Sequence, residues 1–232
     1  MEKLDHNENP LPGNWQTILF VVACAGAILG STWSSAGTEA DYLGGYLQYL
    51  CKPFATLMIV YWCHKERLIQ NNRLTKFVFL GMSLSLLGDI LLMIPLDLFI
   101  FGLLAFLSAH IAYLYAFTSD TRLFQSKAGL ILYLVIGGSV YLLLWPSLNI
   151  VLKAAVGVYV IVLAGMASQL FSRWKNLSTT GSTSGALGGL LFIISDGTLA
   201  VNKFLVTVPF SAIIILSTYW AAQYLIWRSI RR

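Results

Sequence analysis

Residues 75–94 read TKFVFLGMSLSLLGDILLMI, a mostly apolar stretch with one carboxylate, Asp89, near its end. A helix of this length crosses the roughly 30 Å of hydrocarbon in a bilayer. Similar stretches recur throughout the 232 residues, of which 57% are hydrophobic and 11% charged. Soluble domains carry about 25% charged residues. The sequence therefore predicts an all-α integral membrane protein, with residues 1–232 forming one transmembrane domain.

Eight membrane-spanning helices are expected, because eight apolar stretches are separated by connections that contain proline or polar residues. They cover residues 15–34, 45–63, 75–94, 99–118, 127–145, 149–171, 183–202 and 208–228. The third and fourth stretches faintly resemble the seventh and eighth, since GDILLM at 88–93 has a counterpart in SDGTLA at 195–200. This similarity suggests a four-plus-four internal duplication.

Basic residues are distributed unevenly among the connections. Twelve of the fifteen lysines and arginines fall on one predicted side of the membrane. These twelve are Lys3, Lys65, Arg67, Arg73, Lys76, Arg122, Lys127, Arg173, Lys175, Arg228, Arg231 and Arg232. The opposite connections contain Glu39, Asp41 and Asp97. Because basic connections face the cytoplasm, both termini, including the polar tail 1–14, are predicted to be cytoplasmic. The basic residues are interpreted as topology determinants, so no nucleic-acid partner is expected.

Lys52, Asp89 and Asp196 are ionisable residues well inside the predicted spans. Each such group costs about 2.5–3.5 kcal/mol at the bilayer centre, so it rarely faces lipid. With the predicted orientation, all three lie roughly 8–11 Å below the outer boundary. A shared depth favours one polar cavity containing both carboxylates. The alternative is a structural Asp–Lys pair that only supports helix packing.

Small residues accompany both carboxylates. Gly81, Ser85 and Gly88 share a helix side with Asp89, while Gly181, Gly185 and Gly189 precede Asp196 at four-residue intervals. Such spacing lets helices approach closely, so both carboxylates are predicted on packing faces. Further polar pairs one turn apart could line the same interior, namely His110 with Tyr113 and Tyr219 with Gln223. No His/Cys/Glu cluster has metal-ligand spacing, and neither a metal nor an organic cofactor is expected.

Several of these residues occur in an order and spacing that resembles a known family. The pieces are Lys52-Pro53, Ser85-Leu86-Leu87-Gly88-Asp89, Phe101-Gly102-Leu103, Phe106, His110, Tyr113, Gly185-Ala186, Phe192-Ile193-Ile194-Ser195-Asp196, Tyr219 and Gln223. Together they resemble the YhhN-like membrane proteins, the lysoplasmalogenase family, over residues 48–228. The resemblance implies an eight-span enzyme that hydrolyses the vinyl ether bond of lysoplasmalogens to a fatty aldehyde and glycerophosphocholine or glycerophosphoethanolamine. The expected partners are a lysophospholipid substrate and membrane lipids. The expected location is the inner membrane of a bacterium.

The family's acidic pair corresponds to Asp89 and Asp196. Vinyl ether hydrolysis requires proton delivery to the β-carbon, which creates an oxocarbenium ion that water attacks. Two carboxyl groups in different environments can divide the tasks of acid and of stabilising base, as in glycosidases. On this interpretation both aspartates are catalytic. The residues expected to bind substrate or orient water are Lys52, His110, Tyr113, Ser195, Tyr219 and Gln223.

Two other functions are compatible with the same residues. Intramembrane Asp and Lys residues also form proton or ion relays, so a proton- or ion-coupled transporter is the main alternative. A purely structural membrane protein is the other. The sequence does not decide which aspartate is the acid, which head group is preferred, or the oligomeric state.

Overall fold

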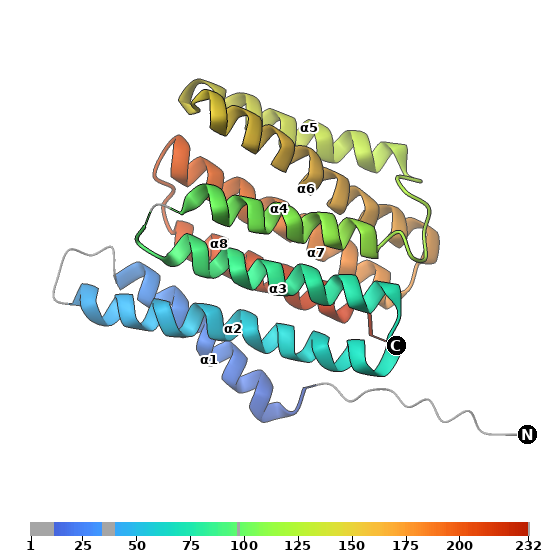
Figure 1. Ribbon diagram of the computed structural model, residues 1–232, viewed down its shortest axis with the longest axis horizontal. Helices are drawn as coiled ribbons and strands as arrows, with labels where there is room; N and C mark the ends of the chain where they lie inside the picture. Colours follow the sequence, from blue (N-terminus) through green and yellow to red (C-terminus); the bar gives the residue numbers. More distant parts are fainter. Residues whose placement is uncertain (1–11, 34–39, 97, 232) are drawn as a thin grey trace, which may run out of the picture.

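The computed structural model describes residues 12–33, 40–96 and 98–231. Within these ranges the chain forms eight α-helices and one 3-10 helix, and no β-strand (Figure 1). The helices are α1 (Asn14–Trp33), α2 (Ala40–Gln70), α3 (Arg73–Met93), α4 (Phe99–Ala116), α5 (Lys127–Leu144), η1 (Trp145–Ser147), α6 (Ile150–Leu177), α7 (Thr180–Phe204) and α8 (Ser211–Arg228). The predicted all-α fold is confirmed.

Each predicted stretch overlaps one α-helix, and the largest difference concerns α2. This helix begins five residues earlier and ends seven residues later than expected. Its connection to α3 consists only of Asn71, which has a left-handed φ of 44°, and Asn72, whose side chain accepts the Thr75 backbone N–H at 2.9 Å. Asparagine tolerates both the left-handed turn and the N-cap position. Basic residues that were expected in connections, such as Lys65 and Arg173, therefore lie inside helix ends.

Six helices, α1 and α3 to α7, are long and apolar enough to cross a membrane. The chain is thus an integral membrane protein by composition and helix length. Helices α2 and α8 have a lower mean hydropathy than these six, because polar residues such as Lys52, Gln48 and Gln223 interrupt them. The count of eight spans therefore stays a prediction, and so does the internal duplication.

The helices form a bundle of antiparallel hairpins. In Figure 1, α1 and α2 lie along one side and α5 and α6 along the opposite side, with α3, α4, α7 and α8 between them. The most extensive packing joins α3 to α4, α1 to α2, and α7 to α8. Helices α2 and α8 touch each other as well as α1 and α3, so both belong to the bundle.

Glycines bring the central helices close together. The position of a Cβ at Gly81 is occupied by the Tyr113 ring, and one at Gly88 would lie 2.6 Å from the Phe106 ring. On α7, a Cβ at Gly188 would lie 3.0 Å from the Ala222 carbonyl, and one at Gly189 would lie 3.1 Å from Ala167 Cα. The prediction that both aspartates lie on helices packed through small residues is confirmed.

Part of the predicted orientation concerns residues outside the described ranges. These are the tail residues 1–11 with Lys3, and also Glu39, Asp97 and Arg232. The cytoplasmic position of the termini consequently stays a prediction that depends on the distribution of charge along the sequence.

Candidate active site

One cavity in the bundle contains both intramembrane carboxylates. Asp89 of α3, Asp196 of α7 and Lys52 of α2 line it together with Ser195 and Tyr219. The helix ends differ from those expected, since Asp196 lies eight residues before Phe204 rather than six before the end of its span. The shared location of the three ionisable groups nevertheless agrees with the expectation.

Asp89 is surrounded by donors. Its Oδ1 lies 3.4 Å from the Lys52 ammonium, and its Oδ2 accepts hydrogen bonds from Thr56 Oγ1 and Tyr219 OH, both at 2.7 Å. Trp220 Nε1 donates to Thr56 Oγ1 at 3.1 Å, which orients that hydroxyl. The Asp89 side chain is 3% exposed. Every partner is a donor and one is a cation, so the site suits a carboxylate anion.

Tyr113 and Gln223 support this cluster from behind. Gln223 Nε2 donates to Tyr219 OH at 3.2 Å, and Tyr113 OH donates to Gln223 Oε1 at 2.7 Å. Both residues are fully buried and neither lines the cavity. Through these bonds they orient Tyr219, and their expected role in substrate binding stays a prediction.

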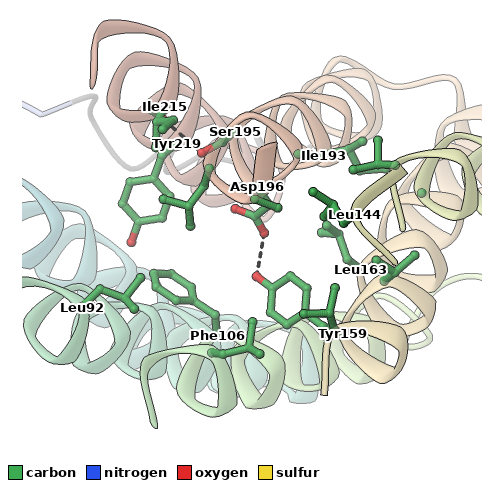
Figure 2. A pocket seen from close by; sticks show the side chains of 18 of the residues that line it. Leu92, Phe106, Leu144, Tyr159, Leu163, Ile193, Ser195, Asp196, Ile215 and Tyr219 are labelled. Atoms are coloured by element: carbon green, nitrogen blue, oxygen red, sulfur yellow. Dashed lines mark hydrogen bonds between the residues drawn. The ribbon is translucent and has the colours of Figure 1, made fainter. Parts of the chain in front are cut away.

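Asp196 has a different environment. Its Oδ2 accepts a hydrogen bond from Tyr159 OH at 2.6 Å, drawn as a dashed line in Figure 2, and lies 3.3 Å from His110 Nε2. His110 Nε2 is also 2.9 Å from Tyr159 OH. The other oxygen, Oδ1, has no hydrogen bond to any residue in the described ranges. The side chain is 14% exposed, so it is more accessible from the cavity than that of Asp89.

His110 is fully buried and does not line the cavity. It lies behind Tyr159, with Nε2 2.9 Å from the tyrosine OH, and its expected role in substrate binding stays a prediction. Its Nδ1 has no hydrogen-bond partner among the described residues. Ser195 does line the cavity, but its hydroxyl donates to the Ile215 carbonyl at 3.1 Å and is not activated by a base.

Aromatic rings separate two carboxylate clusters. One is Asp89 with Lys52, Thr56 and Tyr219, and the other is Asp196 with Tyr159 and His110. Phe192 is fully buried and meets His110 edge-on at 5.1 Å and Tyr219 at 5.8 Å between ring centroids. Phe106 meets Tyr219 at 5.9 Å, and Figure 2 shows it beneath Asp196, between Tyr219 and Tyr159. Packed rings of this kind hold the clusters at a fixed separation.

The rest of the cavity wall is apolar. Leu144 of α5 and Leu163 of α6 lie on the side of Asp196 that faces away from Tyr219 (Figure 2). Further lining residues from α5 and α6 are Tyr133, Gly137, Val140, Val156, Val160 and Ala164. A cavity that is polar at one end and apolar over the rest suits an amphiphilic ligand. In the described part of the chain, no three His, Cys, Asp or Glu residues group closely enough to hold a metal ion.

Comparison with known proteins identifies the family, whose model matches residues 47–230. The chain belongs to the YhhN family. Lysoplasmalogenase TMEM86A of Bos taurus is 31% identical over 186 residues, which cover 76% of this chain and 74% of the relative. Lysoplasmalogenase TMEM86A of Homo sapiens is 32% identical over 186 residues, which again cover 76% of this chain and 74% of the relative. Lysoplasmalogenase TMEM86B of Sus scrofa is 37% identical over 61% of this chain and 58% of the relative. No solved structure is significantly similar.

These YhhN-family relatives identify the chain as an enzyme. The matched region includes α2 from Leu47 onward and all later helices, whereas α1 lies outside it. Both carboxylate clusters are thus built from the family region alone.

Two site residues of this YhhN-family chain were missed from sequence. Thr56 lies one helical turn after Lys52, and that spacing could have placed its hydroxyl beside the ammonium. Tyr159 is a single tyrosine in an apolar stretch of α6. Nothing in the surrounding sequence distinguishes Tyr159 from a packing residue.

Proposed function

We propose that this YhhN-family enzyme hydrolyses the vinyl ether bond of lysoplasmalogens, producing a fatty aldehyde and a glycerophospho-alcohol. The main support is the pair of carboxyl groups in unlike environments that line one largely apolar cavity. The names of the relatives agree with this chemistry. Lysoplasmenylcholine and lysoplasmenylethanolamine are the proposed substrates.

Asp196 is the proposed acid. Its Oδ1 has no hydrogen bond to described residues, and its partners Tyr159 and His110 form no full ion pair with it unless the imidazole is protonated. The protonated Asp196 gives its proton to the β-carbon of the vinyl ether, so a C–H bond forms and the double bond is lost. The α-carbon and the ether oxygen then share the positive charge of an oxocarbenium ion.

Asp89 is the proposed stabilising anion, because its three partners, Lys52, Thr56 and Tyr219, are all donors to its oxygens. Water adds to the α-carbon and returns one proton to Asp196. The resulting hemiacetal passes its hydroxyl proton to the glycerol oxygen as the C–O bond breaks. One water is consumed, and the acid is restored for the next turnover.

We also propose that all eight α-helices cross the inner membrane of a bacterium and that both termini are cytoplasmic. The support is the concentration of basic residues in alternate connections. In this orientation the carboxylates lie nearer the outer surface, and the apolar cavity wall accepts the alkenyl chain.

The transporter alternative has less support. Transporters favour helices that are broken near the bilayer midplane, whereas α3 and α7 continue without interruption past Asp89 and Asp196. Proton flux that depends on lipid and occurs without release of aldehyde would favour transport over hydrolysis.

The proposal is tested with purified protein and three lipids. Lysoplasmenylethanolamine and lysoplasmenylcholine should release aldehyde, whereas an acyl lysophospholipid with the same head group should release no fatty acid. Release of fatty acid, or no release of aldehyde from either vinyl ether lipid, would contradict it.

A further inference from the structure

The charge of Lys52 is already balanced within the cavity. Its ammonium lies 3.4 Å from Asp89 Oδ1, and the side chain is only 13% exposed. A phosphate at Lys52 would place a second anion beside the buried Asp89, where like charges repel strongly. An anionic head group therefore needs another cation.

Only two other described cations lie at this end of the bundle. The antiparallel hairpins bring the beginnings of α4 and α6 and the end of α7 to the same end (Figure 1). Lys203 lies at the end of α7, and Lys153 lies in the first turn of α6. Apart from Lys52, the remaining lysines and arginines in the described ranges lie in the last or first turns of helices, or in connections, at the opposite end of the bundle.

Lys203 stands at the rim of the cavity. Its ammonium lies 5.4 Å from the ring centroid of Phe99, and Phe99 packs edge-on against Phe204 at 5.3 Å. Both rings line the cavity. Lys203 is exposed and pairs with no carboxylate among the described residues. A cation over an aromatic face is positioned while it stays able to bind an anion.

Lys203 also has a suitable relation to Asp196. The two residues are seven positions apart on α7, so they lie on the same helix face, about 10 Å apart along the axis. Ala200 lies between them and lines the cavity. Along the substrate, three glycerol carbons separate the vinyl ether oxygen from the phosphate ester oxygen. Because this spacer is short, a phosphate bound near Lys203 would place the vinyl ether group close to Asp196.

We propose that Lys203 binds the phosphate of the lysolipid head group at the mouth of the cavity. This inference rests on the proposed function and adds the residue that recognises the anionic part of the substrate. Lys153 provides a matched control. Its ammonium lies 4.5 Å from the ring centroid of Trp145, which does not line the cavity.

The first test compares Lys203→Gln with Lys153→Gln on two substrates. For lysoplasmenylethanolamine, Lys203→Gln should raise KM about tenfold with little change in kcat, because one charged hydrogen bond is lost. For a 1-alkenylglycerol without phosphate, the same variant should match the wild type. Lys153→Gln should match the wild type on both substrates, and Lys203→Arg should retain a low KM. Equal effects of Lys203→Gln on the two substrates would overturn the proposal.

The second test measures equilibrium binding of an alkyl-ether lysophospholipid, which has the same phosphate but no vinyl ether to cleave. Lys203→Gln should weaken binding about tenfold, and Lys153→Gln should not. Unchanged binding in Lys203→Gln, or an equal loss of binding in Lys153→Gln, would contradict a head-group site at Lys203. Lys203-dependent binding by an enzyme that cleaves no vinyl ether would support the site and refute the proposed reaction.

Discussion

Asp89 and Asp196 differ in what surrounds their oxygens. Asp89 has an ammonium and two hydroxyl donors, whereas Asp196 has a tyrosine hydroxyl, an imidazole and one oxygen with no partner in the described ranges. Because of this difference, replacement of each aspartate by asparagine should have a different effect on the protein. Both variants should lose vinyl ether hydrolysis, but only one should lose much stability.

Asp89→Asn should reduce both turnover and stability. The substitution leaves the Lys52 ammonium, whose side chain is 13% exposed, without its anion. Breaking a largely buried ion pair from one side costs about 3 kcal/mol. Thermal unfolding in detergent and an aldehyde assay measure the two effects. As a control, Asp89→Asn combined with Lys52→Met should recover stability but not activity. A stable and active Asp89→Asn variant would remove Asp89 from the mechanism.

Asp196→Asn should abolish turnover while the protein keeps nearly the stability of the wild type. Tyr159 can still donate to the amide oxygen, and no buried cation loses a full partner unless His110 is protonated. The aldehyde assay and thermal unfolding are again the measurements. Appreciable aldehyde release by this variant would show that another group supplies the proton.

The carboxylates of the site could be predicted because charges inside apolar stretches are costly and therefore conspicuous. The residues that lie behind these carboxylates could not be placed from the sequence. His110, Tyr113 and Gln223 were found as polar residues, but their burial one layer behind the cavity depends on helix rotation and tilt. Tyr159 was not found at all, since its role arises from the approach of α6 to α7.

The close contact of α3 with α4 determines the shape of the polar end of the cavity. Gly88 faces Phe106, and Phe106 both lines the cavity and packs against Tyr219. Tyr219 in turn donates to Asp89. A small change at this helix contact should therefore displace Phe106 and Tyr219, and with them the hydrogen bond to Asp89.

Gly88→Ala should lower the unfolding temperature and the turnover rate together. The new methyl group would lie 2.6 Å from the Phe106 ring, and overpacking of this kind costs about 1–3 kcal/mol. Gly138→Ala on α5 is the matched control, because its methyl group meets nothing within 4 Å and alanine favours helix. Equal unfolding temperatures for the two variants would contradict the packing described for α3 and α4.

The positions of the helices along the chain could be predicted from hydropathy, whereas the residues at which they begin and end could not. Helix α2 extends beyond its apolar stretch to Gln70 because Glu66 and Gln70 find partners at the carboxyl end of the chain, Arg231 and the Ile230 carbonyl. Such long-range contacts extend a helix past the point where local composition would end it. The polar faces of α2 and α8 similarly lower their hydropathy because those faces point into the bundle.

The whole molecule has a strong charge asymmetry between its two ends, and this asymmetry predicts its orientation. Fusions of a fluorescent protein that folds only in the cytoplasm should fluoresce at both termini. Fluorescence at one terminus only would mean an odd number of crossings. In that case α2 or α8, the two helices of lower hydropathy, would not span the membrane.

Hydrolysis in deuterium oxide tests proton delivery inside this cavity. Because Asp196 exchanges its acidic proton with solvent, the aldehyde should carry one deuterium on the carbon next to the carbonyl group. Mass spectrometry of the trapped aldehyde measures that label. An aldehyde formed without deuterium on this carbon would contradict protonation of the vinyl ether by a carboxylic acid.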